Sequence, residues 1–380
     1  MGKQYLMTAG PTPVPERVQL AIAQPVLYHR SPAFLEVMRE VHENLRWIFQ
    51  TSQSVLVLAG SGTAAMEAAI TNFHSRGDRV LCLRGGRFGD RWSQMCRAFQ
   101  LEVVDVESEW GRAIDVDAVA EALDRHPDIR AVYATASESS TGVAHPVREI
   151  AALCRDRETL CVVDAVSALG AFDVPQDDWG IDVLVAGSQK ALMCPPGLAF
   201  VGVSQKAWRF NERAGLPRFY LDLARERKNQ EKSETAWTPA ISLVVGLREA
   251  LRMLKEEGLE RVFARHRRLA EATRQACRAI GCALFAVDSP SPAVTAVKVP
   301  VGIDGSAMVK HLRARYGITI AGGQEHLKGK IFRVAHLGYY DTFDILTAIS
   351  GIEMTLSDLG HSFERGAGVR AASELLRSGA

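Results

Sequence analysis

A lysine that follows a short apolar run is the residue of this sequence best placed to do chemistry. Residues 183–186 are apolar and lie between Asp182 and Gly187, which predicts a buried strand of an α/β sheet. Lys190 follows just beyond the carboxyl end of that strand, where open α/β sheets place their ligands. Apolar surroundings there would lower the pKa of its amine and suit it to Schiff base formation with an aldehyde. The alternative is a solvated lysine in a surface loop.

Further polar residues follow other predicted strands. Asp164 comes directly after the apolar residues 160–163, so two strand ends would aim a carboxylate and the Lys190 amine into one crevice; alone, Asp164 would be an N-cap or turn residue. Residues 60–63, Gly-Ser-Gly-Thr, lie between a strand and a helix, where free N–H groups favour phosphate, although a plain turn has the same pattern. Residues 137–142 add a polar loop. Together these features describe a site for pyridoxal 5′-phosphate (PLP).

The elements that must position these residues alternate along the chain. The pattern predicts a mostly parallel, seven-stranded type of sheet with helices on both faces, which is an α/β fold. Residues 198–203 follow the lysine strand too closely for a helical crossover, so we expect an antiparallel strand there. The predicted strands are 55–58, 80–83, 101–106, 131–134, 160–163 and 183–186, and the predicted helices are 34–49, 64–73, 90–99, 115–123 and 147–154.

The C-terminal part has a different pattern and predicts a smaller α+β domain. Two long helices are expected at 241–255 and 261–279. Residues 205–234 are polar, and the charged run 225–232 is expected to be a solvated loop or helix face, the alternative being a phosphate-binding patch. The remaining predicted elements are strands at 294–299, 318–321 and 331–335, helices at 306–316 and 344–359, and a last helix at 369–376 that could fray. We therefore expect an extended N-terminal arm (1–16), a large domain (17–257) and a small domain (258–380).

The composition points to a soluble protein with a small-molecule ligand. With 45 basic and 44 acidic residues, the chain has no charge excess that would favour nucleic acid or an acidic membrane. Seven cysteines without a C-x-x-C pair fit buried thiols in a reducing compartment, so a cytoplasmic location is expected. The sequence offers no secretory signal, no run long enough to span a bilayer and no histidine pair spaced for a metal.

Several motifs, in order and spacing, resemble the class V aminotransferases of PLP fold type I. The most similar group is the alanine–glyoxylate and serine–pyruvate (serine–glyoxylate) aminotransferases. The resemblance covers nearly the whole chain up to about residue 360. The motifs are Gly10-Pro11-Thr12-Pro13, Ser61-Gly62-Thr63, Glu138-Ser139-Ser140-Thr141-Gly142, Val163-Asp164-Ala165-Val166, Gly187-Ser188-Gln189-Lys190, Pro195-Pro196-Gly197 and Arg333.

The resemblance implies a role for each matching residue. Lys190 would hold PLP covalently and move the substrate proton, and Asp164 would pair with the pyridine nitrogen. Arg333 would clamp the substrate carboxylate, with Gly10 and Ser139 also near the substrate. The remaining cofactor-binding residues would be Ser61, Gly62, Thr63 and Gln189 at the phosphate, Phe88 and Val166 on the ring faces, Ser139 near the ring hydroxyl, and Thr238 from the partner subunit of a homodimer.

The implied reaction is a ping-pong transfer of an amino group from alanine or serine to glyoxylate or pyruvate. Two departures bear on cofactor affinity: Phe88 stands where mammalian members have tryptophan, and Thr235 where some members have tyrosine. Arg30 could bind a second carboxylate, so a dicarboxylate substrate stays an alternative. His29 is a candidate substrate contact. The alternatives are a lyase or desulfurase of the same class, although Gln189 replaces the histidine that desulfurases carry there, and an α/β protein that binds no PLP.

Overall fold

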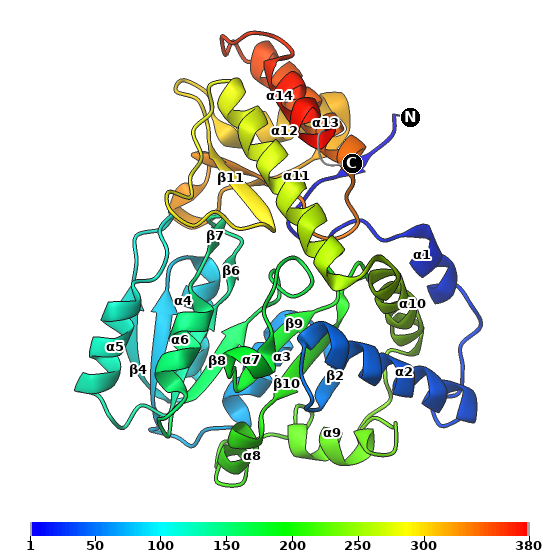
Figure 1. The fold of residues 1–380 in the computed structure, drawn as a ribbon, viewed down its shortest axis with the longest axis vertical. Coiled ribbons are helices and arrows are strands. Elements are labelled where there is room, and N and C mark those ends of the chain that lie inside the picture. The colour runs from blue at the N-terminus through cyan, green and yellow to red at the C-terminus, as the bar shows by residue number, and fades with distance from the viewer. Residues whose placement is uncertain (1, 378–380) are drawn as a thin grey trace.

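The computed structural model describes residues 2–377 and is built on one large sheet. Its strand order is β2-β10-β9-β8-β5-β3-β4, and it crosses the lower half of Figure 1. β10 (Gly197–Val203) runs antiparallel to both of its neighbours, as the sequence predicts, and the other pairings are parallel. The remaining strands are β2 (Val55–Gly60), β3 (Arg79–Arg84), β4 (Glu102–Glu107), β5 (Ala131–Thr135), β8 (Leu160–Asp164) and β9 (Val183–Gly187).

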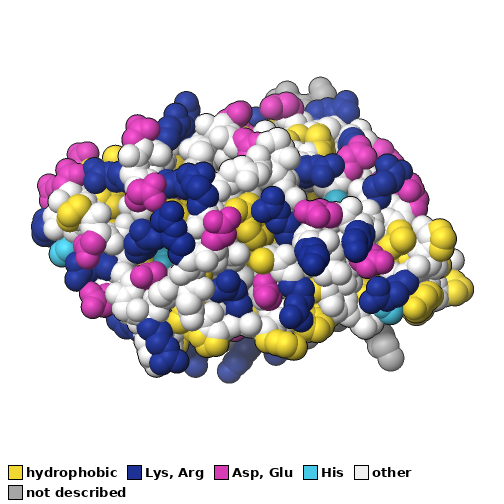
Figure 2. All heavy atoms as spheres, turned by 90° about the horizontal axis from the view of Figure 1, so that it is seen from below, with side chains coloured by type: hydrophobic (Ala, Val, Ile, Leu, Met, Phe, Trp, Pro, Cys, Tyr) yellow, Lys and Arg dark blue, Asp and Glu magenta, His cyan; other side chains and the backbone are white. Residues whose placement is uncertain are grey.

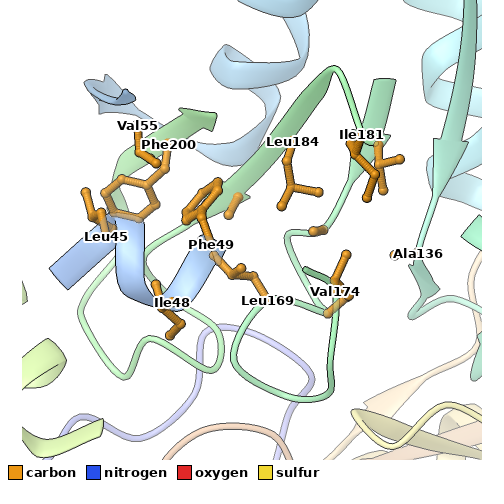
Figure 3. Packing of buried hydrophobic residues seen from close by; sticks show 14 of the residues in the cluster. Leu45, Ile48, Phe49, Val55, Ala136, Leu169, Val174, Ile181, Leu184 and Phe200 are labelled. Carbon is orange, nitrogen blue, oxygen red and sulfur yellow. The ribbon is translucent and has the colours of Figure 1, made fainter. Parts of the chain in front are cut away.

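Both faces of this sheet are buried, because alternate strand residues belong to two different apolar clusters. In β2, Val55 and Val57 pack into one cluster, and Leu56 and Leu58 into the other. Figure 3 shows the first cluster, where Phe49 of a helix lies near Leu184 and Phe200 of the sheet. The covering helices are α2 (Pro32–Phe49), α3 (Gly62–Thr71), α4 (Arg87–Ala98), α5 (Val116–Arg125), α6 (Val147–Cys154), α7 (Gln176–Trp179), α8 (Gln205–Asn211), α9 (Leu223–Gln230) and α10 (Ile241–Glu257).

The C-terminal residues form a second layer above the large sheet (Figure 1). Its antiparallel sheet has the order β11-β14-β13. Residues of this sheet and of the long C-terminal helices together form a separate apolar cluster. The strands are β11 (Val294–Lys298), β13 (Ala321–Gly322) and β14 (Ile331–Ala335). The helices are α11 (Leu259–Ala279), α12 (Gly305–Tyr316), η1 (Glu325–Leu327), α13 (Thr342–Asp358) and α14 (Ala367–Arg377). The final helix is therefore present, while residues 378–380 lie outside the described part.

The structure corrects the sequence predictions at three places. The strand expected at 318–321 is divided into β12 (Ile318–Thr319) and β13, because β12 pairs in parallel with β1 (Tyr5–Leu6) of the arm whereas β13 pairs with β14. Of residues 137–142, expected to be a polar loop, only the first two form a strand, β6 (Ser137–Glu138), and the rest form the buried turn to β7 (Val143–Ala144). A short helix, α1 (Glu16–Ile22), follows the arm and packs on α10.

On the face that Figure 2 shows, acidic and basic side chains are interspersed, and no large patch carries charge of a single sign. Within residues 2–377, no helix is long and apolar enough to cross a membrane. Among the same residues, no group of three or more His, Cys, Asp or Glu side chains could hold a metal ion. All seven cysteines are buried as free thiols.

Candidate active site

Lys190 lies just past the end of β9, as predicted, and the N-terminal arm lies against its amine. Its Nζ donates a hydrogen bond to the carbonyl of Ala9. A Cβ atom added to Gly10 would lie 2.4 Å from Lys190 Nζ, so only glycine lets the arm pass this close. Burial lowers the pKa of Lys190 to about 8, while the charge of Asp164 acts in the opposite direction. A larger share of this amine is therefore unprotonated and nucleophilic at neutral pH.

Asp164 ends β8, the strand next to β9, and is 4% exposed. Its Oδ1 accepts a 2.8 Å hydrogen bond from the backbone N–H of Val166. Burial raises the pKa of Asp164 to about 6, and the Val166 bond and the charges of Arg91 and Lys190 oppose that rise. The parallel pairing of β8 and β9 thus brings a carboxylate and an amine to one sheet edge, which was the central expectation from the sequence.

The N-terminus of α3 supplies a third part of this site. Ser61 is its N-cap residue but makes no side-chain capping bond, so the first turn has backbone donors free to meet an anion. A Cβ on Gly62 would lie 2.7 Å from a methyl of Val166, which explains why glycine stands there. The buried side-chain amide oxygen of Gln189 has no hydrogen-bond partner among the described residues. These groups form a polar cradle of the kind that holds a phosphate.

These elements enclose a cavity of about 250 Å³. Nine residues predicted for the site line it: Gly10, Ser61, Gly62, Thr63, Phe88, Asp164, Val166, Gln189 and Lys190. Six more residues line it: Pro11, Ser137 and Pro196, which belong to motifs named from the sequence without a role of their own, and Met66, Arg91 and Ser167, which were not identified.

Arg91 is the most consequential of the residues that were missed. Its Nη1 donates a 3.0 Å hydrogen bond to the hydroxyl of Thr63, and its guanidinium lies 4.7 Å from the centre of the Phe88 ring. Its charge acts on both Asp164 and Lys190. The available signal was its spacing, because residues three apart in a helix share a face and Phe88 had already been assigned to the site.

Arg333 and Ser139 form the part of the site next to the small sheet. Arg333 lies on β14 and donates 3.0 Å and 2.7 Å hydrogen bonds to the carbonyls of Gly322 and Ser139. Burial lowers the pKa of Arg333 to about 10, and its charge acts on Lys190. Neither Arg333 nor Ser139 lines the 250 Å³ cavity, but Arg333 stands close enough to the lysine to influence its charge.

Thr238 lies away from the lysine cavity of its own chain. It is exposed and borders a separate hollow together with Tyr220, Glu226 and Trp237. His29 and Arg30 also lie outside the lysine cavity: the His29 ring contacts Tyr28, and Arg30 pairs with Glu234 at 3.4 Å. None of these three residues therefore belongs to the cavity that Lys190 lines in its own chain.

Comparisons with known proteins agree with this geometry. Residues 4–338 match the family model described as aminotransferase class-V. The chain is 46% identical to the soluble hydrogenase small subunit of Synechococcus sp., over 98% of both chains. It is 38% identical to the L-aspartate–glyoxylate aminotransferase of Paracoccus denitrificans, covering 97% of this chain and 95% of that one.

It is also 38% identical to the serine–glyoxylate aminotransferase of Methylorubrum extorquens, covering 99% of this chain and 96% of the relative. The crystal structure of ureidoglycine–glyoxylate aminotransferase from Bacillus subtilis superimposes with a TM-score of 0.95 at 31% identity, over 99% of each chain. The large mixed sheet with its smaller C-terminal layer is thus the fold of PLP fold type I aminotransferases. The chain belongs to the class V aminotransferase family.

Proposed function

We propose that this aminotransferase uses PLP to move the amino group of a small amino acid, alanine or serine, to glyoxylate or pyruvate. One observation carries the proposal: a buried carboxylate, an amine with a lowered pKa and the uncapped N-terminus of α3 meet in one cavity. Those groups match the pyridine nitrogen, the aldehyde and the phosphate of PLP. The unpartnered amide of Gln189 at the phosphate end adds to the fit.

The proposed residue roles follow from this arrangement. When bound, PLP supplies an aldehyde that condenses with amines and a ring that accepts electrons from the substrate α-carbon. Ser61, Gly62, Thr63 and Gln189 would bind the phosphate, while Phe88 and Val166 would contact the two ring faces. Asp164 would hold a proton on the pyridine nitrogen, and Lys190 Nζ would take a proton from the substrate α-carbon and return it.

Arg333 would bind the substrate carboxylate. Two of the five N–H donors of an arginine are engaged here by the carbonyls of Gly322 and Ser139, so the guanidinium is held in place before substrate arrives. A single fixed clamp beside the cavity suits a monocarboxylate. The relatives that act on glyoxylate support a small 2-oxo acid as acceptor.

The substrates are tested by a panel of donors and acceptors. Purified protein loaded with PLP is mixed with alanine, serine or aspartate, each against glyoxylate, pyruvate and 2-oxoglutarate, and the new amino acid is quantified. We expect alanine or serine with glyoxylate or pyruvate to have the highest kcat/KM. A preference for aspartate or 2-oxoglutarate would overturn the substrate assignment but not the transamination.

A lyase or desulfurase reaction is the chemical alternative within the class. Cys277 and Cys282 are buried, and burial raises the pKa of both thiols, to about 11 for Cys282, which disfavours the thiolate that a nucleophile needs. No cysteine is among the residues that line the lysine cavity. Release of ammonia or sulfide without pyridoxamine phosphate would support the alternative reaction.

We also propose that the enzyme is a cytoplasmic homodimer with shared sites. The exposed position of Thr238 outside its own cavity supports a role at the phosphate of the partner's cofactor. Mixing a Lys190→Ala variant with a Thr238→Ala variant would then regenerate one complete site per mixed dimer. Random assortment makes about half of the dimers mixed, so wild-type PLP affinity should return in about a quarter of all sites, and an active monomer would contradict this arrangement.

The proposed domain boundary lies between α10 and α11. Only Gly258, with a φ of +85°, separates the two helices. The arm (1–16) would belong functionally with both domains, because β1 pairs with β12 while Ala9 and Gly10 lie against Lys190. Limited proteolysis that cleaves first near residue 258 would support these limits.

A further inference from the structure

Glu138 is a buried glutamate whose two carboxylate oxygens are both filled by hydrogen-bond donors. Its Oε2 accepts from the backbone N–H groups of Phe88 and Gly89, at 2.9 Å and 3.1 Å. Its Oε1 accepts from the backbone N–H and the hydroxyl of Ser140. The side chain has no exposed surface. Four donors on two oxygens suit an ionised carboxylate: burial raises the pKa of Glu138, and the bonds from Ser140, Gly89 and Phe88 oppose that rise.

These bonds make Glu138 the N-terminal cap of α4, supplied from a different element. Gly86, the N-cap residue of α4, has no side chain to do so. The N–H of Arg87 donates to the Ser140 hydroxyl at 3.1 Å, so residues 138–140 satisfy the first three N–H groups of the helix. A negative charge is also favourable at a helix N-terminus. The first turn of α4 carries the Phe88 ring, and Arg91 follows one turn later, so this cap fixes both at the cavity.

The same hairpin also holds the arginine that would bind the substrate carboxylate. Ser139, next to Glu138, offers its carbonyl to Arg333 Nη1 at 2.7 Å. The negative charge of Glu138 favours the charged guanidinium of Arg333. A displacement of Glu138 would therefore act on Phe88 at one end of the site and on Arg333 at the other.

We propose that Glu138 is a positioning residue that couples the cofactor-stacking ring of Phe88 to the substrate-binding Arg333 through the β6–β7 hairpin. The proposal rests on the proposed function, since it assigns Glu138 a role for PLP and for the substrate carboxylate. Glu138 does not line the lysine cavity, so its proposed action is through the residues it holds.

Glu138→Gln is the direct test. Glutamine has one acceptor oxygen and one donor amide, so its amide would face either the N–H groups of Phe88 and Gly89 or the N–H of Ser140, whose hydroxyl can turn to accept. We expect the dissociation constant of PLP and the KM for the amino acid each to rise about tenfold, with a smaller change in kcat. Absorbance titration of the cofactor-free protein gives the first constant, and steady-state kinetics at saturating PLP give the second.

Glu353→Gln is a matched control. Glu353 of α13 is a buried glutamate that accepts bonds from the N–H groups of Gly366, Gly368 and Val369, and so caps α14 from another element. Glu353 does not line the lysine cavity. This variant should lose stability in urea as Glu138→Gln does, but should change both constants by less than about twofold.

A double-mutant cycle separates positioning from general destabilisation. If Glu138 acts through Phe88, then adding Glu138→Gln to Phe88→Ala should weaken PLP binding by less than about threefold, which is non-additive. Likewise, adding Glu138→Gln to Arg333→Lys should raise the KM for the amino acid by less than about threefold. Additive effects in both cycles would overturn the coupling.

Gly86→Ala provides a second variant should Glu138→Gln not fold. The φ of Gly86 is 166°, an extended backbone that alanine adopts freely, but its Cβ would lie 2.4 Å from the Glu138 carboxyl carbon. We expect the same rise in both constants. Unchanged constants in a folded Gly86→Ala or Glu138→Gln variant would refute the role of Glu138. A wild-type protein that binds no PLP would instead refute the proposed function.

Discussion

Asp164 ends β8 and Lys190 follows the end of the adjacent parallel strand β9, and burial moves the pKa values of the two side chains toward each other, to about 6 and about 8. Each charge favours the charged form of the other, so the pair resists complete neutralisation. Both groups are costly to bury in the absence of a ligand. This cost is a physical sign that the pair serves a bound molecule more than it serves the fold.

The first prediction concerns stability without cofactor. Because the folded-state pKa of Asp164 lies above its ordinary value of 3.8, the folded protein binds more protons than the unfolded chain between pH 4 and about 6. Charged Asp164 therefore lowers the free energy of unfolding at pH 7. Asp164→Asn should raise that free energy by up to about 3 kcal/mol, and the difference between variant and wild type should disappear below pH 4. Urea unfolding at several pH values measures this. Asp156→Asn, at an exposed position, is the control, and a destabilised Asp164→Asn variant would contradict the sign.

The second prediction concerns the pH dependence of cofactor capture. The neutral amine of Lys190 attacks the aldehyde, so the capture rate should rise as the pH increases through about 8. Since the Asp164 carboxylate raises the pKa of Lys190, the midpoint should move to lower pH in Asp164→Asn. Stopped-flow absorbance after mixing cofactor-free protein with PLP measures the rate. A midpoint that moves upward in the variant would be inconsistent with this pairing.

The third prediction concerns the carboxylate clamp. Arg333→Lys should raise the KM for the amino acid about 100-fold, because lysine cannot keep the bonds to Gly322 and Ser139 and also bind a carboxylate through two N–H groups. Arg274→Lys is a suitable control, because Arg274 is also a buried arginine bonded to a carbonyl, that of Ser291. Equal effects of the two variants on the KM would argue against a substrate contact by Arg333.

The fourth prediction concerns the arm. The methyl group of Gly10→Ala would overlap the amine of Lys190. The φ of Gly10 is +133°, a backbone conformation that alanine adopts only with strain. We expect PLP binding to weaken at least tenfold. Gly77→Ala is the matched control, because Gly77 also has a positive φ (+81°) but no atom within 4 Å of the added Cβ. It should lose stability through backbone strain while keeping its PLP affinity.

The sequence predicted much of the site, because the relevant residues are encoded locally. Lys190 and Asp164 follow apolar runs, and the α3 turn combines small residues between a strand and a helix, so each position was readable from its neighbours. The parallel pairing of neighbouring strands then brought them together. Of the nine predicted site residues that line the cavity, four were assigned through the family resemblance, namely Gly10, Phe88, Val166 and Gln189.

Contacts between distant segments could not be predicted in this way. Nothing near Tyr5 indicates that it pairs with Ile318, and nothing near Ala9 indicates that its carbonyl meets Lys190. Glu138 belongs to a polar motif that was expected to be a loop, and only the structure reveals that it is buried beneath the first turn of α4. Arg91 was missed because its helical spacing from Phe88 was not followed into the cavity.

The most direct measurement is the position of the covalent cofactor. The protein is incubated with PLP, reduced with borohydride, digested and examined by mass spectrometry, with Lys190→Ala treated in parallel. We predict one pyridoxyl group per chain, attached to Lys190, and none in the variant. A protein labelled only at other lysines, or one that takes up no PLP, would contradict the assignment of this cavity as the PLP site.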